Sequence, residues 1–455
     1  MKLRKSSLVL LIAVGCVCAG YAATASAQQL AGVEVDPAGV LRTKVVADPS
    51  GRLTRQRLEQ MRVGLNPDVA KPSPMRKISL VRLERELALR MASGQAPTDD
   101  MRYLAGLTRV RYVFYFPEIQ DIVIAGPAEG YGLDLTGRPV GIETGQSVLE
   151  LQDLIVALRA YAPQAEGIRV ISCSIDPTQE GLRQMQEFWQ SLPGSAALRD
   201  SRAIAQGMRD SLGLHTVTIR GVSPKTHFAQ VLVEADYRMK LIGIGLEQPP
   251  VNIPSYVSKA SPRSATANGM QRWYFTPNYE TVRVSDDRHA MELVGEGVKL
   301  INENELVQGD GSRVESSLVD RASQLFVKAF TEKYPELARR SPVFGQLRNL
   351  IDLSIAAAYI HEQDWFGKAG WKMSVFADEK AYPVESYTAP TQVETAVNVI
   401  WKGNRLMTPI GGGVNIQPTK ALSTDNVMAD DNGQLGQLQN GIDIKALQDG
   451  QWWWD

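Results

Sequence analysis

The stretch RVRYVFYFPEIQDIVIAGPAEGYGLD, residues 109–134, decides the fold class of this chain. Its first eight residues are rich in aromatic and β-branched side chains, and the apolar run DIVIAG follows after the short segment PEIQ. This pattern predicts an antiparallel β-hairpin. The second strand runs into Gly126, Gly130 and Gly132, and a glycine-rich turn after a strand raises the question of a nucleotide-binding loop.

The residues that follow these glycines argue against a phosphate-binding turn. Such a turn needs a helix directly after it, because the helix N-terminus supplies the amide hydrogens and the dipole that bind phosphate. Here the chain continues into LDLTGRPVGI, residues 133–142, which has a strand–turn–strand pattern, and no Gly-Lys-Ser/Thr follows. We therefore expect the glycines to allow tight bends between strands.

Strand and helix patterns alternate downstream of the hairpin. Ser147 and Glu150 form a Ser-x-x-Glu capping box, which predicts the start of a helix. The next predicted elements are a strand over 168–175, a helix that Asp176 caps, a helix over about 200–212, a strand LHTVTIRGV and a long apolar helix over 224–242. This order of elements predicts an α+β (mixed α/β) fold.

Residues 249–269 are rich in Pro, Ser and Ala without periodicity, and we interpret them as a linker between an N-terminal α/β domain, 28–248, and a C-terminal α+β domain, 270–425. The second domain is predicted to contain a three-strand meander formed by QRWYF, ETVRVS and AMELVGEGVKLI. A helical hairpin over 316–362 and a closing β-hairpin that turns at 402–404 complete it. The last segment, 426–455, is predicted to be a flexible tail that ends in a Trp triplet.

The first 27 residues predict export. A basic start is followed by the short apolar core SLVLLIAVGCVC, and Ala25-Ser26-Ala27 is a small-residue cleavage pattern. We expect a signal peptide that is cleaved after Ala27, which places the mature chain in the periplasm or outside the cell. The alternative is a lipid anchor on Cys16. No later stretch is long and apolar enough to span a membrane, so we expect no transmembrane segment in the mature chain.

Composition narrows the classes of partner. The chain has 455 residues, with 49 basic and 50 acidic side chains, and the predicted signal peptide holds three of the basic ones. A mildly acidic chain without a basic block argues against a nucleic acid partner. Cleavage would also remove Cys16 and Cys18 and leave Cys173 as the single thiol, so no internal disulfide is expected.

Several stretches together resemble a family of secreted planctomycete proteins that is defined by domain of unknown function 1598. The resemblance rests on the segments YLAGLTRVRYVFYFPE, DIVIAGPAEGYGLD, LIVALRAY, VLVEADYRMKLIGIGLE and QRWYFTPNYETVRVSDDRHAMELVGEGVKLI. They lie between about residues 100 and 310. The resemblance implies export and a shared fold, and it implies no activity, cofactor or catalytic residue. One departure is the segment PEIQDIV, which lacks a glycine at the expected turn.

Cys173 and the histidines are the first candidates for catalysis. Alternation along its strand places Cys173 on the face of Ile171 and Ile175, which predicts a core cysteine, and the alternative is a redox or nucleophilic thiol. No histidine pair has zinc-helix spacing, and no Gly-x-Ser-x-Gly elbow is present. The four histidines are His215, His227, His289 and His361. His289 could join Glu305 or Asp310 in an oxygen-rich metal site, but the spacing of a calcium loop is missing.

Two further groups of side chains could contact a ligand. Asp236 and Lys240 are spaced i, i+4 in the helix 224–242, where we expect them to pair on its surface; the alternative is that Glu234, Asp236, Tyr237, Arg238 and Lys240 form a polar ligand face. The tryptophans of the second half could bind sugars or partner proteins, although inside strands and helix ends they are usually core. They are Trp273, Trp365, Trp371, Trp401 and the triplet Trp452–Trp454. The triplet could dock on its own domain or a partner, or remain free.

These observations predict an exported, non-catalytic binding or scaffold module of the cell envelope, whose partner is an envelope protein or a polysaccharide. Its expected contact surfaces are the helical hairpin 316–362, the strand edges beside it and the C-terminal tryptophans. No catalytic residue, cofactor or metal ligand is predicted. The alternative function is an extracytoplasmic hydrolase of polysaccharide or peptide, with carboxylates that one sequence cannot single out.

Overall fold

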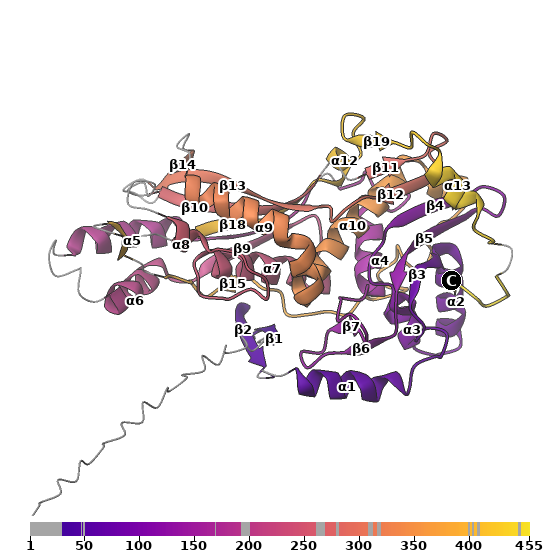
Figure 1. Cartoon of the computed structure of the whole chain (residues 1–455), viewed down its shortest axis with the longest axis horizontal. Helices are drawn as coiled ribbons and strands as arrows, with labels where there is room; N and C mark the ends of the chain where they lie inside the picture. Colours follow the sequence, from indigo (N-terminus) through magenta and orange to yellow (C-terminus); the bar gives the residue numbers. More distant parts are fainter. Residues whose placement is uncertain are drawn as a thin grey trace, which may run out of the picture.

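The computed structural model describes residues 30–46, 48, 51–168, 170–192, 201–260, 269–278, 282–307, 313–315, 320–398, 401–402, 405–406, 410–444 and 447–455 (Figure 1). The predicted signal peptide and its cleavage site lie outside these residues, as does most of the linker's second half. Two large sheets with both parallel and antiparallel neighbours, together with many helices, confirm the mixed α/β class.

The larger sheet lies on the left of Figure 1 and has nine strands. Their order is β1 (Leu30–Val35), β2 (Val40–Val46), β15 (Gln392–Val393), β9 (His215–Arg220), β8 (Ile171–Asp176), β18 (Ile410–Ile416), β10 (Gly269–Pro277), β13 (Val298–Val307) and β14 (Arg313–Glu315). The pairs β2–β15 and β10–β18 are parallel, whereas the other pairs are antiparallel.

The second sheet lies on the right of Figure 1 and has seven strands. Their order is β19 (Val427–Ala429), β11 (Val282–Val284), β12 (Ala290–Leu293), β4 (Tyr112–Phe116), β5 (Asp121–Ala128), β3 (Ser73–Ser79) and β20 (Trp453–Trp454). Two small hairpins are formed by β6 (Tyr131–Leu133) with β7 (Pro139–Gly141) and by β16 (Trp401–Lys402) with β17 (Arg405–Leu406). The second of these is the predicted closing hairpin.

Each large sheet combines strands from before residue 249 with strands from after residue 269. The larger sheet joins β8 and β9 to β10 and β18, and the smaller joins β4 and β5 to β11 and β12. The division into successive domains at 28–248 and 270–425 stays a prediction, and strands of the two segments are interleaved in both sheets.

The predicted β-hairpin of RVRYVFYF and DIVIAG is confirmed. β4 and β5 pair antiparallel from Tyr112 opposite Ala125 to Phe116 opposite Asp121. At the turn where a glycine was expected, Gln120 adopts a positive φ of 53°, a conformation that costs a side chain some energy. Among the glycines beyond, Gly126 is required by packing, because a Cβ there would overlap the backbone carbonyl of Arg109. The chain then enters β6 rather than a helix, in agreement with the argument against a phosphate turn.

The prediction of a three-strand meander is wrong. β10 and β13 pair directly with each other, from Gly269 opposite Leu306 to Pro277 opposite Val298. The hairpin β11–β12 lies between them in sequence but belongs to the other sheet, where β12 pairs with β4. The β11–β12 hairpin therefore leaves the sheet of β10 and β13, because β12 pairs with an edge of β4 that the local sequence pattern does not reveal.

Helices α9 (Arg321–Arg340) and α10 (Pro342–Glu362) confirm the helical hairpin. α10 and α4 (Leu151–Ala160) lie in the middle of the molecule between the two sheets (Figure 1), and α7 (His227–Gly243) packs against β8 and β18 of the larger sheet and against α10. α7 and α10 are buried along most of their length, as expected for helices that have neighbours on all sides. The remaining helices are α1 (Arg52–Arg62), α2 (Leu80–Ala92), α3 (Asp99–Arg102), α5 (Gln179–Ser191), α6 (Ser201–Leu212), α8 (Tyr256–Lys259), α11 (Trp365–Lys368), α12 (Pro418–Ala421) and α13 (Gln434–Asn440).

The C-terminal segment 426–455 is packed onto the smaller sheet instead of forming the expected flexible tail. It holds β19, α13 and β20, and the backbone of Trp453 pairs with Ile78 of β3. Trp452 is only 6% exposed, and Leu435 and Ile442 join an apolar cluster with Phe114 and Phe116. The polar composition hid this packing, because a few apolar side chains and one open strand edge are sufficient to hold the segment.

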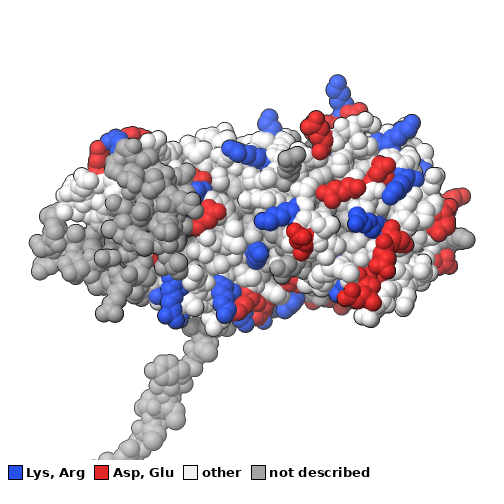
Figure 2. All heavy atoms as spheres, turned by 90° about the horizontal axis from the view of Figure 1, so that it is seen from above, with Lys and Arg blue, Asp and Glu red and all other residues white. Residues whose placement is uncertain are grey.

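The described residues contain no helix with both the length and the apolar character that a membrane span requires. On the face shown in Figure 2, basic and acidic side chains are interspersed over the described surface. Export and the absence of a nucleic acid partner stay predictions.

Candidate functional site

The candidate site lies where α4 and α7 begin. Glu150 is the N-cap residue of α4, and Asp153 lies in the first turn of that helix. His227 is the first residue of α7, whose N-cap Thr226 accepts a hydrogen bond from the backbone of Ala229. Two helix starts that are more than 70 residues apart in sequence thereby bring two carboxylates and one imidazole together, and we call this group the α4–α7 junction.

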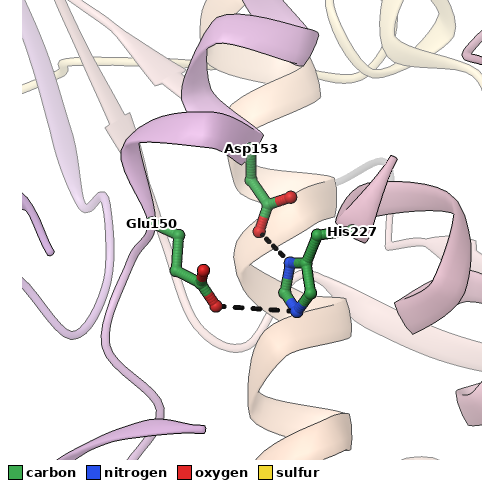
Figure 3. A group of neighbouring side chains, drawn as sticks. All are labelled: Glu150, Asp153 and His227. Atoms are coloured by element: carbon green, nitrogen blue, oxygen red, sulfur yellow. Dashed lines mark hydrogen bonds and ion pairs between the residues drawn. The ribbon is translucent and has the colours of Figure 1, made fainter. Parts of the chain in front are cut away.

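The imidazole of His227 lies between the two carboxylates (Figure 3). Its Nδ1 is 2.9 Å from Asp153 Oδ2, which is hydrogen-bonding distance, and its Nε2 is 3.5 Å from Glu150 Oε1. The side chains of His227, Glu150 and Asp153 are 13%, 11% and 7% exposed, so the group is largely but not completely shielded from solvent.

Two side-chain amides and one phenol lie around the junction. Gln152 Nε2 donates to Glu150 Oε2 at 2.7 Å and to the Tyr387 hydroxyl at 3.3 Å. The amide of Gln346, which α10 contributes, lies with its nitrogen 3.5 Å from His227 Nε2. Three buried oxygens of this group have no hydrogen-bond partner: Asp153 Oδ1, Gln152 Oε1 and Gln346 Oε1. The junction thus has more acceptors than its own donors satisfy.

The electrostatics follow from this surplus of acceptors. Burial alone would lower the pKa of His227, but the charges of Asp153 and Glu150 and the hydrogen bond to Asp153 outweigh it and raise that pKa to about 9. Burial raises the pKa of Glu150 despite the opposing effect of His227. A group of this composition can hold a proton, or it can hold a cation in the same position.

Cys173 lies in β8 with 1% of its surface exposed, on the same face as Ile171 and Ile175. Burial raises the pKa of its thiol well above the ordinary value. The prediction of a core cysteine is therefore confirmed, and a buried neutral thiol offers no support for a nucleophile or a redox centre.

The other three histidines lie apart from the junction. His215 is buried in β9, where desolvation lowers its pKa to about 3. His361 Nδ1 is 3.1 Å from the backbone carbonyl of Tyr161. His289 Nδ1 is 3.5 Å from Asp287 Oδ2 at the surface. For the metal site considered around His289, Asp310 lies outside the described residues and the side chain of Glu305 is not described.

The predicted ion pair between Asp236 and Lys240 is present, with Nζ 2.9 Å from Oδ2, but its predicted place on the helix surface is wrong. Asp236 is 0% and Lys240 5% exposed, because α7 packs against β8 and α10 rather than lying at the surface. Lys240 also donates to the carbonyl of Ile175 at 2.9 Å. Burial raises the pKa of Asp236 to about 6 against the effect of Lys240.

The other polar side chains of α7 are equally enclosed. Glu234 pairs with Arg138 and, at 3.5 Å, with Arg238, and Arg238 also binds Glu247 at 2.6 Å. Tyr237 is 9% exposed. The structure therefore gives Glu234 and Arg238 internal partners and buries Tyr237, and these residues do not form an open ligand face.

Four of the tryptophans are core residues. Trp273 and Trp365 are 0% exposed, Trp371 is 5% exposed and Trp452 is 6% exposed. The Trp273 ring donates to Ser323 and lies 4.4 Å from the ring of Phe326. The side chain of Trp401 is not described. The expected aromatic contact surface is thus replaced by aromatic packing, apart from the partly exposed Trp453 and Trp454.

Sequence reasoning missed Glu150 and Asp153 as site residues. Glu150 was interpreted as half of a capping box, yet no side chain caps α4, and the hydroxyl of Ser147 donates to the carbonyl of Pro342 at 2.7 Å. The available signal was the segment Glu150-Leu-Gln-Asp153, which sets three polar side chains at the start of a strongly apolar helix. His227 was named only among the four histidines.

Comparison with known proteins agrees with the resemblance seen in the sequence. No curated protein and no solved structure matches the chain. The segment that matches a family model contains most of β8 and all of β9 and α7 with His227, whereas Glu150 and Asp153 precede it. Residues 173–256 match the family model described as "Protein of unknown function (DUF1598)", which confirms the predicted family for this segment.

Proposed function

We propose that the protein is exported and acts in the cell envelope as a non-catalytic binding module, with the α4–α7 junction as its ligand site. One observation carries this proposal: buried oxygens of Asp153, Gln152 and Gln346 have no hydrogen-bond partner, although these side chains lie around His227 and Glu150. A buried polar atom without a partner costs about 1–3 kcal/mol, so a ligand that satisfies these atoms would gain that energy.

The partner, an envelope protein or a polysaccharide, would contact the surface outside this site. The buried tryptophans and most of α10 are unsuited to that role. The outer side of α9, where Leu325 is 44% exposed, is a better-placed part of the helical hairpin for such a contact.

A ligand screen on three variants tests the junction. Glu150→Gln and His227→Gln change the junction, and His289→Gln changes a surface histidine that also has a carboxylate neighbour. We expect small solutes of the envelope to raise the Tm of the wild type and of H289Q, but not of E150Q or H227Q. A screen in which no solute discriminates between junction variants and H289Q would contradict the proposal.

A hydrolase remains the second candidate because the Asp153–His227 hydrogen bond is the kind of contact that orients a general base. This function predicts that the full chain releases reducing sugars or peptides from envelope polymer, with a rate that falls in H227Q and not in H289Q. Absence of turnover by the wild type, with ligand binding retained, favours the binding module.

A further inference from the structure

We infer that the α4–α7 junction binds a divalent transition-metal ion through His227 Nε2, Glu150 Oε1 and the side-chain oxygen of Gln346. The inference rests on the proposed function, since it names the ligand of that same site. Among the described residues, Glu150, Asp153 and His227 can bring one ligand atom each within 4.8 Å of one another.

The spacing of the ligand atoms fits a metal better than a hydrogen bond. His227 Nε2 and Glu150 Oε1 are 3.5 Å apart, whereas the hydrogen-bonded pair on the other side of the ring is 2.9 Å apart. Two ligands of a tetrahedral zinc ion at about 2.0–2.1 Å from the metal lie roughly 3.4 Å from each other. The observed separation therefore matches that of two ligands of one ion.

Asp153 occupies the position of a carboxylate that orients a metal-binding histidine. Its Oδ2 lies 2.9 Å from His227 Nδ1, and His227 Nε2 is on the side of the ring that faces Glu150. When a metal replaces the Nε2 proton, the Nδ1 proton is donated to Asp153. Such outer carboxylates fix the tautomer and ring orientation of histidine ligands. Asp153 is thus a positioning residue, and His227 and Glu150 are ligands.

Gln346 supplies an independent indication. Gln346 is 4% exposed, its side-chain Oε1 has no hydrogen-bond partner, and its side-chain nitrogen is 3.5 Å from His227 Nε2. A half turn about the last side-chain bond exchanges oxygen and nitrogen and places Oε1 where the nitrogen now lies, 3.5 Å from His227 Nε2. The buried oxygen of Gln346 then gains the partner that the protein does not provide.

The ligand set indicates the class of ion. One imidazole nitrogen with oxygen ligands suits zinc and its first-row neighbours, whereas Ca²⁺ takes six to eight oxygen ligands. The carboxylates of Glu150 and Asp153 also balance the charge of a divalent ion in a largely buried position.

Zinc titration of the full chain after treatment with a chelator tests the inference. Calorimetry should show one Zn²⁺ per chain in the wild type and in H289Q, and loss of this binding in H227Q and E150Q. Asp153→Asn should keep the stoichiometry of one and weaken the affinity by about 10–100-fold. It should also shift the visible spectrum of the Co²⁺-loaded protein, which a purely structural role of Asp153 would leave unchanged. Circular dichroism identifies any variant that fails to fold, and the folded variants then decide.

Two results would overturn the inference: a wild type that binds no Zn²⁺ at the junction, or H227Q and E150Q variants that bind it as the wild type does. The solute screen then separates the two proposals. If a non-metal solute still stabilises the wild type and H289Q but not E150Q, the junction remains a ligand site and only the metal is wrong. If no solute does so, the proposed function is wrong as well.

Discussion

Two buried charged groups in this protein are built in opposite ways. Arg76 of β3 is 0% exposed, and all three of its guanidinium nitrogens donate. Its acceptors are both carboxylate oxygens of Asp455, at 2.9 and 3.0 Å, and the backbone carbonyls of Val69, Ala105, Asp68 and Lys71. At the α4–α7 junction, by contrast, three buried oxygens have no partner.

The difference separates a structural charge from a site. Arg76 ties the C-terminal strand to β3, and the ring of Trp453 also covers its guanidinium at 4.7 Å. A fully paired group of this kind has no capacity left for a ligand. The junction has buried acceptors without partners and keeps a small exposed fraction, so it retains the capacity to bind a ligand.

The largest expected effect concerns the fully paired group. Arg76→Met removes the cation that binds Asp455 and four backbone carbonyls, so we expect the free energy of unfolding to fall by about 3–5 kcal/mol. Urea denaturation measures this value. The matched control is Arg42→Met, because Arg42 is half exposed in its ion pair with Glu394 and should cost less than about 1 kcal/mol. Equal losses of unfolding free energy in the two variants would contradict a structural role of the buried Arg76 that the exposed Arg42 lacks.

His215 tests how much folding stability is lost when a buried imidazole nitrogen has no hydrogen-bond partner. Its pKa is lowered from 6.5 to about 3 by burial, and its Nε2 has no partner. The unfolded chain therefore binds a proton below about pH 6.5 that the folded chain refuses until about pH 3, and stability falls as the pH decreases through this window. The loss over the whole window is at most roughly 5 kcal/mol.

The measurement compares wild type with His215→Leu by urea denaturation between pH 7 and pH 4. We expect the difference in unfolding free energy to move steadily in favour of H215L as the pH falls. His289→Leu, which replaces a partly exposed histidine, controls for the loss of any histidine. A difference that is independent of pH would show that His215 does not resist protonation in the folded state.

The smallest expected effect is at the junction itself. Burial raises the pKa of Glu150, which means that the fold disfavours its charge, and glutamine keeps the shape without the charge. In the absence of ligand, Glu150→Gln should therefore change the free energy of unfolding by less than about 1 kcal/mol, or increase it. A loss as large as that of R76M would make Glu150 a structural residue and not a ligand.

How well each part of the fold could be predicted depends on the sequence separation of the residues that interact in it. The β4–β5 hairpin, α7 and the α9–α10 hairpin were predicted because each depends on a local pattern of apolar residues. The pairing of β12 with β4 and of β20 with β3 was not predicted. These contacts join segments more than 150 residues apart, and the choice among open strand edges is made by the whole fold.

The site was predicted least well, for the same reason. Ser147 and Glu150 fit a capping box locally, but the carboxylate of Glu150 faces His227, which α7 brings from elsewhere in the chain. The pairing of Asp236 with Lys240 followed from helix geometry, whereas its burial depends on β8 and α10. Composition alone could not distinguish a paired acid from one with spare oxygens.

The central claim is that the α4–α7 junction binds a transition-metal ion, and anomalous diffraction at the zinc edge tests it most directly. Crystals of the full chain grown after chelator treatment and then exposed to Zn²⁺ would be measured beside crystals of E150Q. We predict an anomalous peak between His227 Nε2 and Glu150 Oε1 in the wild type, bordered by Gln346, and no peak there in E150Q. A wild-type map with no peak at the junction, or with zinc only beside His289 and Asp287, would contradict the account.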